Sequence, residues 1–495
     1  MPELKLPRST PAAEGLCPRD ILGLVKTINQ KQLSVHSLML LRHGRVVAEG
    51  WWNPVREDRP HLLFSLTKSF TSTAIGFAVQ EGLLSLEDNV LSFFDDALPC
   101  RPCEYMGLVK IRHLLTHTTG FDSDPMCFRA PKDRAGHFLR TYLEHEPGSH
   151  FAYTDDGPDL LSAILQKCTG QTLEEYLAPR LFTPLGITGW HWSKSPDGYS
   201  LGGTGLCLKT EDIAKFGQFL LQRGEWDGVQ LLSADWVQAA ASRVTATPGT
   251  AGDWAQGYGY LLWQCVPEDV FRGDGAFGQF CIVLPRQDMV VVLTGGNNEG
   301  AQIMNLLWET LLPAQQETAL PESSGAQSEL EHTLATLSLP TPVGEKSSPL
   351  AARYSGVEYE LSPNPLGLTC IRFDFGTEDT VLLRAGSDSC RLPIGFGEWR
   401  EGRAFLHPDR SYASCPFLET VACAGAWNGG NYHLEIRFPA APYCYSLNVA
   451  FGEAPILRGS WNVSFGPLTT DTIFARQAKP QQAAQPVCAG DSTFI

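Results

Sequence analysis

Short apolar runs in two separated parts of the chain predict the strands of one β-sheet. Residues 37–50 form two strand-like runs on either side of a turn at His43-Gly44. Further runs separated by Gly, Pro and Asp predict strands at 258–265, 278–284 and 289–294. A helix is expected to follow at 302–312.

The region between these runs, residues 65–240, is predicted to be mostly helical. Apolar residues recur at helical spacing in three segments, at 111–115, 160–166 and 210–223. Thr210 is a suitable N-cap, because Glu211 and Asp212 fall in the first turn after it. The simplest architecture is therefore one sheet built from both ends, with a helical insert between them.

The remainder of the chain predicts a second, all-β domain. Residues 314–348 are rich in Pro, Ser, Glu and Gln and indicate a linker, with one short helix at 329–337. Short strands separated by Gly, Asn or Pro then recur at 369–375, 381–383, 432–438 and 446–451. We expect a first domain at 1–313, the linker, a β-sandwich or barrel at 349–477 and a tail at 478–495.

Composition narrows the functional classes. The chain has 495 residues, 43% of them hydrophobic, and a net charge of −16, which disfavours binding to nucleic acid or to an anionic membrane surface. No apolar run reaches the ~18 residues of a membrane helix, and the start lacks a secretory signal. The 14 cysteines are then expected to be free thiols in the cytoplasm. Cys100 and Cys103 form one C-x-x-C, without the second pair that a zinc site needs.

Ser65 and Lys68 are the first candidate catalytic residues. They form the single S-x-x-K of the chain, at a predicted helix start that follows an apolar stretch. Three residues apart on a helix, the two side chains share a face and can hydrogen-bond. A serine becomes a nucleophile when a neighbouring base takes its proton, and the helix N-terminus favours a developing oxyanion. A solvated lysine beside an ordinary serine is the structural alternative.

Two further stretches carry similar potential. Tyr153-Thr154-Asp155 follows a Pro-Gly turn, and a tyrosine beside a lysine can relay a proton. The segment 273–279, Gly-Asp-Gly-Ala-Phe-Gly-Gln, leads into an apolar strand, where glycines allow close approach of a substrate to the backbone. A half-buried loop tyrosine and a glycine-rich hairpin turn are the structural alternatives.

Taken together and in this order, the three stretches resemble the penicillin-recognising serine hydrolases. That family includes class C β-lactamases, D-Ala-D-Ala carboxypeptidases, and related esterases and amide hydrolases. Additional similarity lies at 113–120 (HLLTHTTG), 181–187 (LFTPLGI) and 202–206 (GGTGL), and the resemblance covers about residues 10–313. It implies an α+β fold, a β-lactamase/transpeptidase-like domain whose antiparallel sheet is flanked by helices, with the active site between the sheet and the helical region.

The resemblance also implies roles for individual residues. Ser65 matches the acylated nucleophile, Lys68 its proton acceptor, and Tyr153 the general base or acid. The backbone N–H groups of Ser65 and Ala276 match the oxyanion hole. The implied reaction needs no metal and no organic cofactor.

Two departures from the family pattern bear on the substrate. Asp155 stands where many members have Asn, and Gly273-Asp274-Gly275 stands where they have Lys-Thr-Gly or His-Thr-Gly. The missing basic residue and the added carboxylates of Asp155 and Asp274 disfavour anionic substrates. Arg272 could compensate if it turns inward. We therefore expect a small neutral or amine-bearing ester or amide rather than efficient β-lactamase activity.

Two alternatives remain at this point. One is a peptidase or amidase acting on D-amino-acid or small cyclic amides, and the other is a non-catalytic descendant that binds a ligand. Self-association is a further expectation.

Other residues are weaker candidates for a site. His113 and His117 have the i,i+4 spacing of a zinc pair but lack the Glu of H-E-x-x-H. Asp122 and Asp124 are expected in a solvated loop or at the rim of the site.

Overall fold

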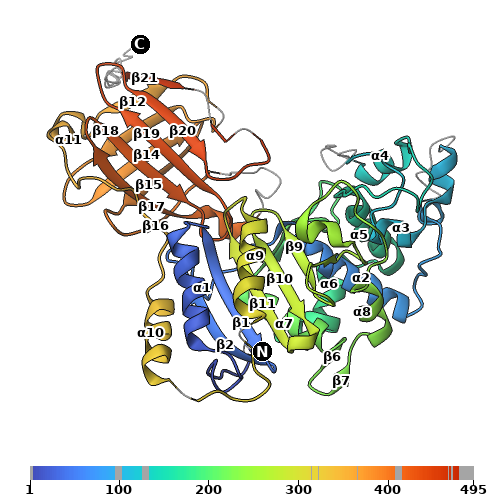
Figure 1. Cartoon of the computed structure of the whole chain (residues 1–495). Helices are drawn as coiled ribbons and strands as arrows, with labels where there is room; N and C mark the ends of the chain where they lie inside the picture. Colours follow the sequence, from blue (N-terminus) through green and yellow to red (C-terminus); the bar gives the residue numbers. More distant parts are fainter. Residues whose placement is uncertain are drawn as a thin grey trace, which may run out of the picture.

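A computed structural model describes most of the chain (Figure 1). The described residues are 4–94, 103–124, 133–313, 315–321, 323–364, 366–406, 415–466, 468–469 and 472–478. Cys100 of the C-x-x-C pair and the predicted tail beyond residue 478 lie outside them.

One antiparallel sheet of six strands, in the order β2-β1-β11-β10-β9-β8, organises the first part of the molecule. Its strands are β1 (Val35–Arg42), β2 (Arg45–Trp51), β8 (Trp263–Gln264), β9 (Phe271–Gly275), β10 (Gln279–Leu284) and β11 (Met289–Gly295). The predicted hairpin and the sheet built from two separated parts of the chain are both confirmed.

The alternation of side chains along these strands gives the sheet two apolar faces. Leu38 and Leu40 of β1 pack on one face with α1 (Pro18–Gln30) and α9 (Gly300–Leu311). Met39 and Leu41 pack on the other face with α7 (Thr210–Leu221). Because successive side chains of a strand point to opposite faces, an apolar run in a central strand covers both layers.

Two local predictions were wrong, and one strand was not predicted. The predicted strand at 258–265 reduces to β8. The unpredicted strand β9 forms a hairpin with β10, which is the glycine-rich hairpin that stood as the structural alternative for 273–279. Gly273 and Gly275 lie within β9, where they are explained by packing against a neighbouring segment, as the site below shows. Thr210 is the first residue of α7, and the N-cap is Lys209.

The helical insert covers the end of the sheet that carries β8 and β9 (Figure 1). Its helices are α2 (Thr67–Gln80), α3 (Ile111–Leu115), α4 (Arg134–Arg140), α5 (Asp156–Thr169), α6 (Leu173–Leu177) and α8 (Ala234–Ala240). Small sheets pair β3 (His61–Leu62), β4 (His191–Trp192) and β5 (Leu206–Leu208), and also β6 (Glu225–Trp226) and β7 (Val229–Gln230). The buried helix α2 contacts α5, α6 and β9, so its first turn lies between the insert and the sheet.

The C-terminal part is a ten-stranded antiparallel sheet that curls nearly into a barrel (orange and red in Figure 1). Its strands are β12 (Glu358–Leu361), β13 (Cys370–Asp374), β14 (Asp379–Ala385), β15 (Asp388–Ile394), β16 (Arg400–Arg403), β17 (Thr420–Asn428), β18 (Asn431–Arg437), β19 (Cys444–Ala450), β20 (Ile456–Trp461) and β21 (Ile473–Gln477). The Gly395 N–H donates to the Cys423 carbonyl, which draws the end of β15 toward β17 and bends the sheet round. The predicted all-β domain is confirmed.

Two helices, α10 (Ser324–Ala335) and α11 (Pro349–Tyr354), lie in the segment of the chain that connects the six-stranded sheet to the C-terminal sheet. α10 packs against α1 and β2, and Lys26 pairs with Glu329 at 2.6 Å. α11 precedes the first strand of the C-terminal sheet. No helix among the described residues is long and apolar enough to span a membrane.

Candidate active site

Ser65 lies in a short 3-10 turn, η1 (Phe64–Leu66), which leads directly into α2. The preceding residue, Phe64, has a positive φ of 47° and is buried. A left-handed conformation at a bulky residue is strained, and such strain persists where the surrounding packing enforces it. The turn presents Ser65 at the N-terminal end of a helix, where N–H groups lack partners within the helix.

Lys68 is an enclosed charged group, with a side chain only 1% exposed. Its Nζ donates to Ser65 Oγ at 2.9 Å, to the Gly203 carbonyl at 2.9 Å and to the Asp155 carboxylate. An ammonium group has three N–H donors, and these contacts use all of them. The site therefore fits a protonated lysine.

The charge balance around Lys68 supports the same state. Burial by itself lowers the pKa of Lys68, but the Asp155 carboxylate, through its charge and its hydrogen bond, raises it above its usual value. Lys68 therefore carries its proton at neutral pH. The family resemblance assigns Lys68 the role of proton acceptor, so one proton must leave this group of residues before it can play that role.

Tyr153 is held against Lys68 and Ser65 by aromatic packing. Its ring stacks on Trp263 with centroids 5.5 Å apart and contacts His117 at 4.6 Å, and Lys68 Nζ lies 4.9 Å from its centroid. Its hydroxyl forms a hydrogen bond with Ser65. Burial raises the pKa of Tyr153, and the charge of Lys68 opposes this only in part, so the phenol is neutral at rest.

The third predicted stretch, residues 273–279, packs against the turn that carries Ser65, and its glycines make this close packing possible. A Cβ at Gly275 would lie 2.1 Å from the Leu63 carbonyl oxygen, and one at Gly273 would lie 2.2 Å from Leu66 Cδ1. Strand β9 therefore lies directly against η1, at a distance that only glycine permits. This contact places Ala276 beside the nucleophile turn, where an oxyanion-hole N–H would be needed.

Arg272 does not replace the missing basic residue of the family. Its side chain is fully buried, pairs with Asp274 at 2.9 Å, and lies 4.8 Å from the Trp254 ring centroid. Burial raises the pKa of Asp274, with Arg272 acting against this. Both cations at the site, Lys68 and Arg272, are thus paired with carboxylates rather than available to bind a substrate carboxylate.

Aromatic side chains flank the nucleophile turn on one side. Phe277, next to Ala276, lies 5.5 Å from the ring of Phe64, next to Ser65. Two rings of the C-terminal domain join them, with Tyr443 6.2 Å from Phe64 and Phe465 4.8 Å from Phe277. Phe465 is 65% exposed, so one of its faces is open. We call these four residues the aromatic wall.

With this geometry established, comparison with known proteins identifies the family. The sequence profile of the family described as Beta-lactamase matches residues 23–308, more than half of the chain. The chain belongs to the β-lactamase family.

Curated relatives and a solved structure are also similar to this chain. An uncharacterized protein from Alkalihalophilus pseudofirmus is 24% identical over 317 residues, which cover 55% of this chain and 87% of that protein. A putative D-alanyl-D-alanine carboxypeptidase from Escherichia coli is 26% identical over 288 residues, 43% of this chain and 66% of that protein. The solved structure of a putative β-lactamase from Bacteroides dorei, 18% identical, superposes with a TM-score of 0.50 over 64% of this chain and 99% of its own, which shows a shared fold.

The fold thus brings all seven predicted site residues into one region of this β-lactamase family member: Ser65, Lys68, Tyr153, Asp155, Asp274, Gly275 and Ala276. It also adds two features that sequence reasoning missed. The Gly203 carbonyl binds Lys68, and the GGTGL stretch at 202–206 was its signal. Phe465 carried no signal, since it lies in the C-terminal domain. His113 and His117 have structural contacts: His113 Nδ1 accepts from Lys110 N at 3.1 Å, and His117 Nδ1 accepts from Thr154 N at 3.4 Å.

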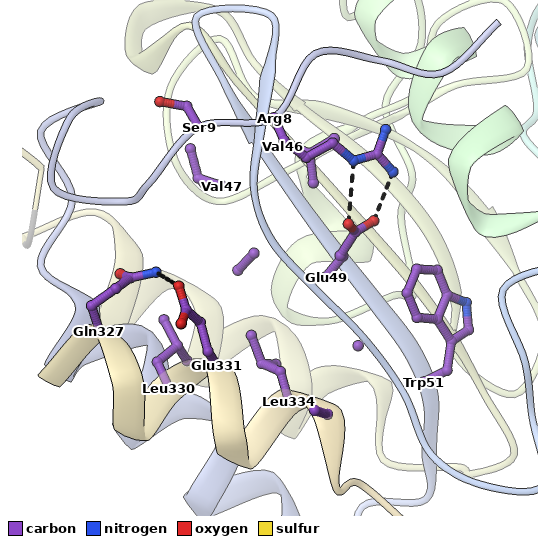
Figure 2. Close-up of a pocket in the computed structure, with 13 residues that line it drawn as sticks. Arg8, Ser9, Val46, Val47, Glu49, Trp51, Gln327, Leu330, Glu331 and Leu334 are labelled. Carbon is purple, nitrogen blue, oxygen red and sulfur yellow. Dashed lines mark hydrogen bonds and ion pairs between the residues drawn. The ribbon is translucent and has the colours of Figure 1, made fainter. Parts of the chain in front are cut away.

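A separate hollow of about 320 Å³ lies between β2 and α10 (Figure 2). Leu330 and Leu334 line it, Arg8 pairs with Glu49 at 2.8 Å, and Gln327 bonds Glu331 at 2.7 Å. Because β2 is at the opposite edge of the sheet from β8 and β9, this hollow is distinct from the Ser65 site.

Proposed function

We propose that this member of the β-lactamase family hydrolyses a small neutral or amine-bearing ester or amide through an acyl-enzyme on Ser65. The observation that carries the proposal is the 2.9 Å hydrogen bond between Lys68 Nζ and Ser65 Oγ, in contact with Tyr153. Once the Lys68–Tyr153 pair has lost a proton, it is a base within hydrogen-bond reach of Ser65, which is the arrangement of an activated nucleophile.

Acylation would begin after the Lys68–Tyr153 pair has lost one proton to solvent. Ser65 Oγ then bonds to the substrate carbonyl carbon, and its proton passes to that pair. The N–H groups of Ser65 and Ala276 would hold the oxyanion. When the intermediate collapses, the bond to the leaving group breaks, and the alcohol or amine departs with the proton from the pair.

Deacylation would repeat these steps with water. The pair takes a proton from water as the water oxygen bonds to the acyl carbon, and Ser65 recovers a proton as the ester bond breaks. The products are the carboxylic acid and free enzyme. Within the pair, Lys68 is oriented by Asp155 and by the Gly203 carbonyl.

The paired charges of the site favour substrates without a carboxylate. A β-lactam, or a peptide ending in a free carboxylate, is best bound by an unpaired cation, whereas Lys68 and Arg272 both have carboxylate partners. The aromatic wall favours an apolar substituent beside the scissile carbonyl. This arrangement supports an esterase or amidase over a carboxypeptidase, the activity named for the Escherichia coli relative.

The proposal is tested by intact-mass measurement after exposure to a fluorophosphonate. We expect one covalent adduct on the parent protein and on Ser72→Ala, and none on Ser65→Ala. Ser72 is the matched control, since it is a buried serine on the same helix. A folded parent that forms no adduct would overturn the hydrolase assignment and favour a ligand-binding descendant.

A second measurement tests the substrate class. The parent should cleave neutral nitrophenyl esters and amides with kcat/KM at least about 100-fold above that for nitrocefin or a D-Ala-D-Ala peptide, a difference of about 3 kcal/mol. Comparable rates on the anionic substrates would show that a cation is available after all.

A further inference from the structure

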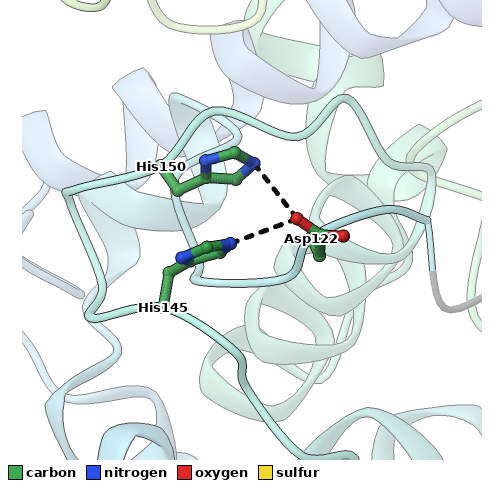
Figure 3. Close-up of side chains that lie close together, drawn as sticks. All are labelled: Asp122, His145 and His150. Atoms are coloured by element: carbon green, nitrogen blue, oxygen red, sulfur yellow. Dashed lines mark hydrogen bonds and ion pairs between the residues drawn. The ribbon is translucent and has the colours of Figure 1, made fainter.

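Three metal-ligating side chains outside the Ser65 site meet on two neighbouring loops. Asp122 Oδ1 lies 3.2 Å from His145 Nε2 and 3.9 Å from His150 Nε2. Figure 3 shows both imidazole rings directing a nitrogen toward the same carboxylate oxygen. The three ligand atoms all lie within 4.8 Å of one another.

The main chain holds these loops together independently of the side chains. The His145 N–H donates to the Gly120 carbonyl at 2.9 Å, Gly148 N–H to Thr118 at 2.8 Å, and Ala152 N–H to His117 at 2.9 Å. Their approach is close, since a Cβ at Gly120 would lie 2.3 Å from the His145 carbonyl oxygen. The three side chains are therefore brought together by the backbone before any ion binds.

We propose that Asp122, His145 and His150 bind one divalent transition-metal ion, with Zn²⁺ the best match. Two ligands bound to zinc at about 2.0–2.1 Å in tetrahedral geometry lie about 3.3 Å apart. The distances from Asp122 Oδ1 to His145 Nε2 and to His150 Nε2, 3.2 and 3.9 Å, are close to that value. Two imidazoles and one carboxylate leave a fourth position for water, as in sites with three protein ligands.

The surroundings of the three residues also suit a cation. The rings of His145 and His150 stack with centroids 4.1 Å apart, and their side chains are 36% and 33% exposed, so both can rotate toward a shared ion. Glu144 adds a second carboxylate, whose Oε2 accepts the Asp122 N–H at 3.2 Å.

The test is calorimetric titration of the chelator-treated full chain with ZnCl₂. We expect one ion per chain with a Kd in the micromolar range, and a higher thermal midpoint with zinc, since an ion that binds only the folded state stabilises it. His145→Ala, His150→Ala and Asp122→Asn should each weaken binding at least about tenfold.

The matched control is His332→Ala, an exposed histidine on α10, which should bind zinc like the parent. Because the chain has many thiols, the cobalt(II) form should show tetrahedral absorption without a thiolate charge-transfer band. Absence of stoichiometric binding to the parent, or equal binding by folded His145→Ala and His150→Ala, would overturn the proposal. None of these readouts depends on turnover at Ser65.

Discussion

At the scale of single residues, the distinctive feature is the ion pair between Lys68 and Asp155. The lysine is enclosed and satisfied on all three N–H groups, and the carboxylate keeps it charged. Many family members have an amide where Asp155 stands, which could accept a hydrogen bond from the lysine without adding charge. The substitution therefore changes the proton affinity of the site more than its shape.

The first prediction is a rising pH profile that depends on Asp155. The pKa values of Lys68 and Tyr153 are both raised, so the pair is fully protonated at neutral pH and loses a proton as pH increases. On a neutral ester, kcat/KM should rise about tenfold per pH unit through neutrality. Asp155→Asn removes the largest influence that raises the pKa of Lys68, so the rise should shift to lower pH and activity at pH 7 should increase severalfold.

The measurement is kcat/KM from pH 6 to 10, corrected for spontaneous hydrolysis. Asp58→Asn, an exposed carboxylate paired with Arg56, is the control and should keep the parent profile. An unchanged profile in Asp155→Asn would show that Asp155 does not set the protonation of the catalytic pair.

At the scale of secondary-structure elements, the site depends on the contact of β9 with η1. The backbone of Gly275 approaches the Leu63 carbonyl so closely that no side chain fits between them. This contact connects β9, the strand next to the edge strand β8, to the turn that leads into α2. The proposed site is therefore anchored where β9 packs against η1.

The second prediction concerns Gly275→Ala. The new methyl group must push β9 and η1 apart, because the atom it meets is a backbone oxygen 2.1 Å away. A displacement of about 1 Å at a catalytic group can cost 100-fold, so we expect kcat/KM and the rate of fluorophosphonate labelling to fall about 100-fold. The control is Gly376→Ala, whose Cβ would meet open space.

Circular dichroism and thermal unfolding would establish that Gly275→Ala still folds. If the folded variant reacts with the probe at the parent rate, the close contact is not what positions the oxyanion hole.

At the scale of the whole molecule, the C-terminal domain packs directly behind the nucleophile turn. Leu62 and Phe64 belong to the same buried cluster as the core of that domain. The Leu62 N–H donates to the Ala440 carbonyl at 2.8 Å, and the Sγ atoms of Cys207 and Cys415 lie 3.5 Å apart. The domain is thus continuous with the segment that carries Ser65, and it adds Phe465 to the aromatic wall.

The third prediction is that Phe465 influences the choice of acyl group. One aromatic contact contributes about 1 kcal/mol beyond its buried area. Phe465→Ala should therefore lower kcat/KM about fivefold for esters with a long or aromatic acyl chain and less than about twofold for an acetyl ester. Phe396→Ala, another exposed phenylalanine of the same domain, is the control. An equal loss on all esters would indicate a general disturbance rather than a specificity contact.

The sequence by itself determined the class of the protein and much of its layout. The S-x-x-K and Tyr-x-Asp motifs located the candidate residues through their resemblance to a known family, and apolar runs of strand length located β1, β2, β10, β11 and four strands of the C-terminal sheet. The apolar runs are local features, because each reflects side-chain spacing within a few residues. The same local reasoning missed β9, because the glycines of a strand that packs closely against a neighbouring segment give no strand signal of their own.

Only the tertiary structure decided the charge and the surroundings of the site. Lys68 contacts Asp155 and Gly203, which are 87 and 135 residues further along the chain. The place of Phe465 beside Phe277, and the meeting of Asp122 with His145 and His150, likewise follow from how distant segments are packed. The periodicity of apolar residues indicates whether a residue is buried. Which residue it contacts depends on the path of the chain through space, and the protonation of Lys68 depends on its contact with Asp155.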